Sequence, residues 1–394
     1  MARTDWAERF AAAFASTPLA DECVFLNPKH LDGGVQKEVC DLLFVLRKDA
    51  LVVQMKCQED PVSRSGGKLE RWVRKQAEAA LSQLQGAIRK IADSDFWCEH
   101  PRKGKIVFAK GALTPIYGVV LTEHFQKRIT LESEFPLVHT NVPIAYFTVN
   151  DFLNLINELR AFPEIVSYLR ARSTLPADVV AGVGGENILF QHYLLNDESF
   201  ANWTTYDAAA HFLDSLQPQL RAAMKIKQEA DRPACEVEKL LRGLASAPTI
   251  AGSPKNDWHL RIQEELLDLH LAERRMLGKS IIETRENVGK GAQSTCFSHK
   301  AVWSDRKPDF LYICASSRGM EREQLVTLGR NLLRAGLAFY GKTQGLACIE
   351  RDNGNYLWFY ESCFDPTEGD KTLGDRVFGS LKHSLSPLKL LSEL

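Results

Sequence analysis

Two short apolar runs separated by a three-residue polar turn constrain the fold of this chain more than any other feature. The first run covers residues 39–46 (VCDLLFVL) and the second covers residues 50–57 (ALVVQMKC), with Arg47, Lys48 and Asp49 between them. Runs of this β-rich composition that are joined by a tight polar turn form a hairpin. The sequence therefore predicts an antiparallel pair of buried strands.

Helical and strand patterns alternate on both sides of this hairpin. The elements expected up to residue 162 are a helix at 5–15, a loop-rich connection at 21–37 containing Asn27-Pro28 and Gly33-Gly34, a long helix from about Lys68 to Ile91, strands at 105–111, 116–122 and 143–149, and a helix at 151–162. This pattern is typical of the α/β class, and it predicts a mixed sheet flanked by helices.

The length of the chain indicates more than one domain, because 394 residues exceed the usual size of a single hydrophobic core. Residues 1–162 are expected to form the α/β core. Residues 163–290 show i, i+3, i+4 apolar spacing and are expected to be mainly helical, with a linker at 246–257. Residues 291–394 return to a mixed pattern and are expected to form a small α/β module of unknown role.

The composition argues against a membrane protein and against a disulfide or zinc framework. No stretch approaches the roughly 18 uncharged apolar residues that a spanning helix needs. The first residues carry Asp5, Glu8 and Arg9, which fit an amphipathic helix better than a secretory signal, so a cytoplasmic protein is expected. The nine cysteines include no closely spaced pair.

Polar side chains interrupt the apolar strands of the expected hairpin. Asp41 stands near the start of the first strand, and Gln54 and Lys56 lie two apart on the second, so the latter two share one face. Because Mg²⁺ prefers oxygen ligands, Asp41, the Gln54 carbonyl and the Met55 backbone carbonyl are candidate metal ligands. Lys56 could orient or polarise the attacking water and offset transition-state charge. This combination predicts phosphodiester hydrolysis.

These residues carry a resemblance to a known family. The runs EVCDLL at 38–43 and VVQMK at 52–56 resemble the PD-(D/E)XK, or restriction-endonuclease-like, nuclease superfamily. The glutamine at the usual acidic position is similar to the QxK variant of the Mrr-like restriction endonucleases. The resemblance covers about residues 1–160. It implies a Mg²⁺- or Mn²⁺-dependent endonuclease with Asp41, Gln54 and Lys56 in the active site.

The resemblance also implies further site residues. An upstream glutamate often joins the metal site in this superfamily, and the candidates here are Glu38, which is favoured, then Glu22, then Glu8. Related nucleases carry a substrate-contacting glutamine on the helix that follows the lysine strand. The glutamines at that place in this chain are Gln76, Gln83 and Gln85.

A basic segment follows the hairpin. Residues 61–110 hold eleven Lys and Arg residues against five acidic ones. Lys68, Arg71, Arg74 and Lys75 at the start of the expected helix could neutralise the phosphates of a nucleic acid, while the alternative is an ordinary solvated surface. Trp72 among them could stack on a base or belong to the core.

The expected function is Mg²⁺-dependent cleavage of DNA, in a setting such as anti-phage or genome defence that rests on association alone. Three alternatives remain open. The first is a nuclease-fold binding module that no longer cuts, the second is an effector in which residues 163–394 sense a ligand or regulatory partner, and the third is an RNase. A homo-oligomer formed through residues 163–394 is also open.

Overall fold

The structure is a computed structural model that describes residues 22–57, 66–100, 104–123, 129, 131–183, 185–196, 198–200, 222, 224–245, 257–291, 294–351 and 355–378. The chain divides into two compact units, Met1–Lys227 and Gln228–Leu394. This division falls inside the stretch 163–290 that the sequence predicts as one helical region. The helix expected at 5–15, and all but the last residue of the linker expected at 246–257, lie outside the described residues.

The first unit is built on a mixed sheet of nine strands. Its order is β6-β5-β1-β3-β4-β7-β9-β8, with β2 paired to β1, and β4, β7 and β9 run parallel to one another. The strands are β1 (Val24–Asp32), β2 (Val35–Glu38), β3 (Leu42–Leu46), β4 (Asp49–Lys56), β5 (Phe96–His100), β6 (Gly104–Phe108), β7 (Thr114–Thr122), β8 (Val138–His139) and β9 (Val142–Thr148). The α/β class with a mixed sheet flanked by helices is confirmed.

The predicted hairpin is present as β3 and β4. Their antiparallel register runs from Leu42 opposite Val53 to Leu46 opposite Asp49. Arg47 turns the chain with a φ of 57°. Leu42 is the first residue of β3 and lies opposite Val53. The last three residues of β4, Gln54, Met55 and Lys56, therefore extend past the start of β3.

The loop predicted for residues 21–37 is wrong, because β1 and β2 occupy most of it. Gly33 and Gly34 have φ values of 58° and 84° and close a tight hairpin between the two strands. Asn27 has a φ of 47° where the register between β1 and β5 shifts. The turn residues therefore mark a hairpin tip and a bulge inside a strand pair.

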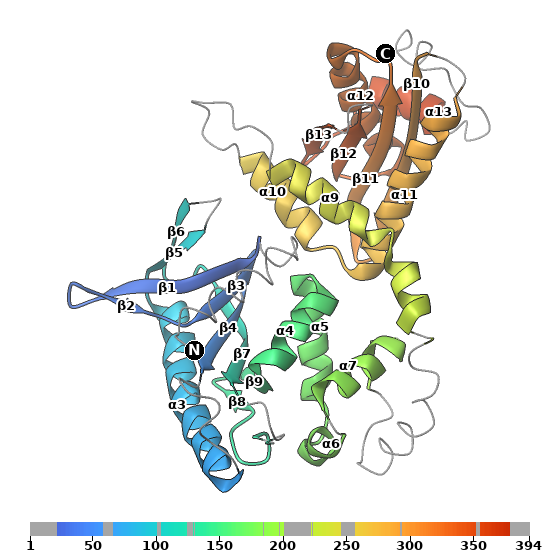
Figure 1. Ribbon diagram of the computed structural model, residues 1–394. Helices are drawn as coiled ribbons and strands as arrows, with labels where there is room; N and C mark the ends of the chain where they lie inside the picture. The colour runs from blue at the N-terminus through green and yellow to red at the C-terminus, as the bar shows by residue number, and fades with distance from the viewer. Residues whose placement is uncertain are drawn as a thin grey trace. The chain divides into compact units, whose positions relative to one another are not determined.

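Helix α3 (Gly66–Asp93) covers one face of this sheet (Figure 1). Its apolar residues recur every three or four positions, and they pack on Val52, Val120 and Ile144. Gly118 on β7 makes room for this close approach, since a Cβ there would lie only 3.0 Å from the Leu84 side chain. The buried residues of the helix are Leu69, Val73, Ala77, Ala80, Leu81, Leu84, Ala87, Ile88 and Ile91.

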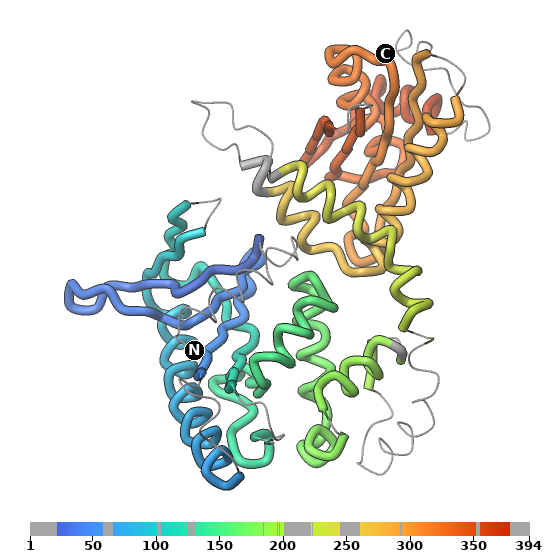
Figure 2. The backbone as a smooth tube through the Cα atoms, viewed as in Figure 1, coloured from blue at the N-terminus to red at the C-terminus, as the bar shows by residue number. Residues whose placement is uncertain are grey.

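The other face of the sheet packs against α4 (Val149–Leu159) and α5 (Phe162–Ser173). Phe152 on α4 meets Phe44 edge to face, and the Tyr117 hydroxyl donates to the Leu169 carbonyl at 2.6 Å. Two further helices follow, α6 (Ala177–Gly182) and α7 (Glu186–Leu195), in the same unit (Figure 2). The candidate hairpin is therefore held between two helical layers.

A buried ion-pair group ties these helices to the loop between β7 and β8. Arg172 on α5 donates to Glu186 at 2.8 Å and to Glu132 at 2.6 Å. The Tyr168 hydroxyl also donates to Glu186. Arg172 and Tyr168 come from α5 and Glu186 from α7, while Glu132 belongs to the loop between β7 and β8. The ion pairs therefore join the two helices to that loop.

The second unit carries a four-stranded sheet in the order β10-β11-β12-β13, with β11 and β12 parallel. Leu311 and Ile313 pack on α12, while Ser316 on the other face contacts Thr284 of α11 at 3.1 Å. Its elements are α9 (Ala234–Ala245), α10 (Asp257–Leu267), α11 (Leu271–Lys290), β10 (Cys296–Ser304), β11 (Lys307–Arg318), α12 (Arg322–Tyr340), β12 (Gln344–Glu350), β13 (Tyr356–Glu361) and α13 (Glu368–Phe378).

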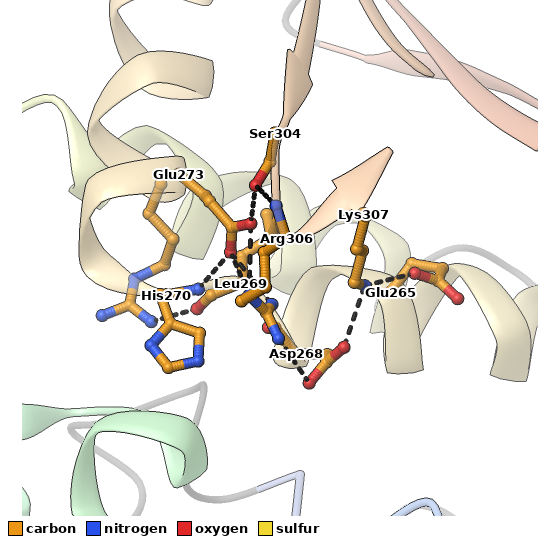
Figure 3. A network of polar contacts seen from close by, with 9 residues as sticks. Glu265, Asp268, Leu269, His270, Glu273, Ser304, Arg306 and Lys307 are labelled. Carbon is orange, nitrogen blue, oxygen red and sulfur yellow. Dashed lines mark hydrogen bonds and ion pairs between the residues drawn. The ribbon is translucent and has the colours of Figure 1, made fainter. Parts of the chain in front are cut away.

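A polar network fastens the turn between β10 and β11 to the junction of α10 and α11 (Figure 3). The Glu273 carboxylate accepts from the His270 backbone N–H at 2.7 Å and from the Arg306 guanidinium at 3.0 Å. Lys307 pairs with Glu265 at 2.5 Å and with Asp268 at 2.9 Å. These charges satisfy one another, which indicates a structural role.

Among the described residues, no helix combines the length and apolar character that crossing a membrane requires.

Candidate functional site

Asp41 lies at the centre of the candidate site, in the short connection between β2 and β3. Its side chain is buried, with 7% of the residue exposed. Its carboxylate oxygen Oδ2 accepts hydrogen bonds from the Gln54 amide nitrogen at 2.6 Å and from the Met55 backbone N–H at 2.7 Å. Since β4 extends past β3, the Asp41 carboxylate takes the position that a neighbouring strand would otherwise fill.

Gln54 and Lys56 meet a third polar side chain, Gln83 of α3. Gln83 Oε1 accepts from Lys56 Nζ at 2.6 Å and from Gln54 Nε2 at 3.1 Å. The strand alternation that places Gln54 and Lys56 on one face directs both toward the helix. The structure therefore brings together Asp41, Gln54, Lys56 and Gln83, which we call the hairpin–helix cluster.

The cluster includes oxygen atoms of the kind that a divalent cation binds. The Gln54 oxygen Oε1 is buried and finds no hydrogen-bond partner among the described residues. The Lys56 carbonyl accepts from the backbone N–H of Glu123, the residue after β7, so the Met55 carbonyl faces the opposite edge of β4, on which the Met55 N–H contacts Asp41. Mg²⁺ commonly takes one or two protein carboxylates and keeps several waters. Among the described residues, no group of three or more His, Cys, Asp or Glu side chains could hold a metal.

The candidate fourth ligands differ in their placement. Glu38 is the exposed last residue of β2 and lies opposite Lys29 in the strand register. The two buried residues Val39 and Cys40 separate it from Asp41. Glu22 is buried, but it precedes β1 at the end where the Val45 backbone N–H donates to the Cys23 carbonyl. The register of β1 with β3 places it about 17 Å along the strand from Asp41. Glu8 lies outside the described residues.

Helix geometry separates the polar residues of α3 into two sides. With 3.6 residues per turn, Gln76 lies about 20° around the helix from Gln83, and Lys68 and Lys75 lie within about 80° of it. Arg71 is about 120° away, while Arg74 and Gln85 lie on the opposite side of the helix. Lys68, Arg71 and Lys75 are exposed.

Arg74 is engaged elsewhere, because its guanidinium forms a two-pronged pair with Glu134 at 2.6 and 2.8 Å. That pair holds the loop between β7 and β8 against α3, and the hydrogen bond raises the pKa of Arg74. Trp72 is half-buried and packs against the core of the first unit. Of the four basic residues singled out from the sequence, Lys68 and Lys75 are therefore the two that lie toward the Gln83 side of the helix.

Sequence reasoning did not single out the carboxyl ends of β7 and β9. Thr122 pairs in register with Lys56 and also lines a polar pocket, together with Thr148, Asp151, Arg172 and other residues. Glu123, the next residue, is buried and donates its backbone N–H to the Lys56 carbonyl at 3.0 Å. A polar pair directly after an apolar strand is the signal that could have pointed to this edge of the sheet.

The surroundings of Asp41 also affect the adjacent thiol. Burial raises the pKa of Cys40 well above its usual value, and the Asp41 carboxylate raises it further. Cys40 is thus a protonated core side chain that donates to the Leu42 carbonyl at 3.3 Å. It is neither a nucleophile nor a thiolate ligand at neutral pH.

Comparison with protein-family models, with curated proteins and with solved structures finds no match to this chain. We therefore infer the function from the residues and their geometry.

Proposed function

We propose that this chain is a metal-dependent nuclease that hydrolyses phosphodiester bonds of DNA. In this proposal Asp41, Gln54 and the Met55 carbonyl hold Mg²⁺ or Mn²⁺, with Glu38 as a candidate outer ligand. The cation would polarise the phosphate and lower the pKa of a bound water. Lys56 acts as the catalytic lysine, whose ammonium offsets negative charge that develops on the phosphate.

One observation carries the proposal: a carboxylate, a lysine and two amides converge where three elements meet, and one buried amide oxygen has no hydrogen-bond partner among the described residues. Asp41 comes from the connection before β3, Lys56 from β4 and Gln83 from α3. Burying the Gln54 oxygen without a hydrogen-bond partner lowers the stability of the fold, because an unsatisfied buried oxygen costs about 1–3 kcal/mol. A cation ligated by the Gln54 oxygen would remove that cost.

The arrangement of the first unit supports a restriction-endonuclease-like core. The strand that carries Gln54 and Lys56 is followed directly by α3, and α3 supplies Gln83 to the cluster. This is the place where the resembling nucleases carry a glutamine that contacts substrate. In the proposal, Gln83 holds the Lys56 ammonium with its oxygen while its amide nitrogen remains available for a phosphate oxygen.

The proposed track for the nucleic acid is the side of α3 next to Gln83. Gln76, Lys75 and Lys68 extend along it from the cluster, and Lys68 lies about 22 Å from Gln83 along the helix axis. Lysines spaced in this way can neutralise successive phosphates without reading sequence. Arg71 lies at the margin of the track, and Arg74 is outside it.

A cleavage assay tests the proposal. The purified full chain is incubated with supercoiled plasmid, single-stranded DNA and RNA, each with Mg²⁺, with Mn²⁺ or with EDTA. We expect metal-dependent cutting of DNA that EDTA abolishes. Cutting of RNA alone would change the substrate class, and the absence of cutting in every arm would remove the nuclease assignment.

A second candidate function is a nuclease-fold module that binds nucleic acid without cutting it. The hydrogen bond from Gln54 to Asp41 favours this alternative, because the amide nitrogen occupies the carboxylate that a cation would need. Calorimetric titration with Mg²⁺ and Mn²⁺ separates the two functions. A binding module would take up DNA and show no metal binding at the cluster.

A further inference from the structure

The two ends of the hairpin–helix cluster determine the direction of its hydrogen bonds. The Lys56 ammonium can only donate, and the ionised Asp41 carboxylate can only accept. Gln83 must therefore turn its oxygen toward Lys56, and that oxygen also takes a hydrogen from Gln54. Gln54 must then turn its nitrogen toward both acceptors. This requirement leaves the Gln54 oxygen facing away, buried and without a described partner.

The nitrogen of Gln54 occupies a position suited to a ligand oxygen. It lies 2.6 Å from Asp41 Oδ2 and 3.1 Å from Gln83 Oε1. Adjacent oxygen ligands of an octahedral Mg²⁺ are about 2.9 Å apart, given Mg–O distances of about 2.1 Å. A half-turn of the amide about its Cγ–Cδ bond exchanges nitrogen and oxygen with almost no change of shape. An oxygen can therefore reach this position without movement of the backbone.

We propose that the Gln54 amide is a metal-operated switch, with its nitrogen toward Asp41 in the metal-free chain and its oxygen toward Asp41 when a divalent cation is bound. The inference rests on the proposed metal site and adds how the side chains of that site pair with one another when no cation is bound. Without the cation, an inward oxygen would face the Asp41 carboxylate and be repelled. With the cation, the inward oxygen becomes a ligand, and Asp41 exchanges one hydrogen bond for the metal.

The switch gives a physical reason for glutamine at position 54. A glutamate there would place two carboxylates within about 3 Å of each other in the metal-free chain, which costs stability. Glutamine weakens the metal site by one negative charge but keeps the empty site paired. Gln83 takes part in both states, because its oxygen still accepts the hydrogen bond from the Lys56 ammonium after the Gln54 nitrogen has turned away.

Nuclear magnetic resonance of the glutamine side chains tests the switch directly. The full chain is labelled with ¹⁵N at glutamine side-chain amides, and the Gln54 signal is identified by its loss in Gln54→Met. In the metal-free chain we expect Gln54 amide protons that are protected from exchange by the bond to Asp41. Saturating Mg²⁺ should remove this protection and shift the signal, whereas the exposed Gln36 on β2 should not respond.

The outcomes separate this inference from the proposed function. If calorimetry shows Mg²⁺ binding that Asp41→Asn abolishes, but the Gln54 signal does not change, the switch is overturned and the metal site stands. If the chain binds no Mg²⁺, both are overturned. Neither outcome depends on a cleavage assay.

A stability measurement gives a second test. In EDTA, Gln54→Glu should lower the melting temperature by about 4 °C or more, because two carboxylates then face each other. Saturating Mg²⁺ should raise the melting temperature of Gln54→Glu by more than it raises that of the wild-type chain. Gln36→Glu adds the same charge at an exposed site and should show neither effect. A Gln54→Glu chain as stable as wild type in EDTA would contradict the switch.

Discussion

Lys56 Nζ donates a hydrogen bond of 2.6 Å to Oε1 of Gln83, and this bond links the last residue of β4 to the middle of α3. The two residues are 27 positions apart in the chain. The lysine is thus held in place by the helix as well as by its strand. A flexible side chain that is fixed in this way loses less entropy when it engages a phosphate.

Replacement of Gln83 tests the importance of this bond. Gln83→Leu removes the acceptor for Lys56 and for Gln54, and loss of such a supporting contact typically lowers activity by about 10- to 100-fold. The matched control is Gln85→Leu, two residues along but on the opposite side of α3, which should cut DNA at the wild-type rate. Cleavage rates measured under the same Mg²⁺ concentration decide between them, and equal rates for both variants would exclude a role for Gln83.

The salt dependence of DNA binding tests the proposed track. Replacing Lys68 and Lys75 together with Gln should reduce the slope of log affinity against log salt by about 1–2, since each phosphate contact contributes about 0.9. Arg74→Gln serves as the control because Glu134 already holds that guanidinium. A fluorescence titration across salt concentrations measures both slopes. A larger effect from Arg74 than from the two lysines would contradict the separation of the two sides.

The sequence predicted the hairpin and the long helix because both have strong local patterns. Apolar runs of β-rich residues and an alanine-rich helix without proline determine their own structure over short distances. The expected strand at 143–149 and the helix after it are likewise present as β9 and α4. Local periodicity was sufficient for these elements.

The rest of the fold depends on contacts between distant residues, which local patterns do not contain. Strands β1 and β2 were missed because Asn27-Pro28 and Gly33-Gly34 resemble loop residues, while the pairing of β1 with β3 and β5 requires the folded sheet. The ion pair of Arg74 with Glu134 spans 60 residues, so a basic run alone could not reveal it. Which of the three glutamines Gln76, Gln83 and Gln85 contacts Lys56 likewise depends on how α3 packs against β4.

The buried pair of Arg172 and Glu186 should contribute strongly to the integrity of the first unit. Arg172→Ala leaves the Glu186 and Glu132 carboxylates without their cation, and breaking a buried pair from one side typically costs about 3–5 kcal/mol. Lys37→Ala removes an exposed pair with Asp32 on the β1–β2 hairpin and should cost far less, because solvent screens that pair. Urea unfolding followed by circular dichroism measures both free energies, and equal losses would contradict the burial argument.

His299 on β10 predicts a pH-dependent stability. Burial lowers the pKa of His299 from 6.5 to about 4, so the unfolded chain binds the proton first as the pH falls. The contribution of neutral His299 to the free energy of unfolding is therefore complete above about pH 6.5 and is lost as the pH falls from 6.5 to about 4. Within that range the free energy of unfolding changes by at most about 1.4 kcal/mol per pH unit. His299→Gln should flatten this part of the profile of unfolding free energy against pH. An unchanged slope in that variant would assign the effect to other groups.

The cleavage of plasmid DNA by Lys56→Ala, measured beside the wild-type chain in Mg²⁺ and in EDTA, tests the account most directly. Lys56 is only half-buried, so its removal should leave the fold intact, which the far-ultraviolet circular dichroism spectrum checks. The account predicts that the wild-type chain cuts in Mg²⁺ and not in EDTA, and that Lys56→Ala cuts at least about 100-fold more slowly. Wild-type cleavage rates in a folded Lys56→Ala chain would contradict the assignment of the active site.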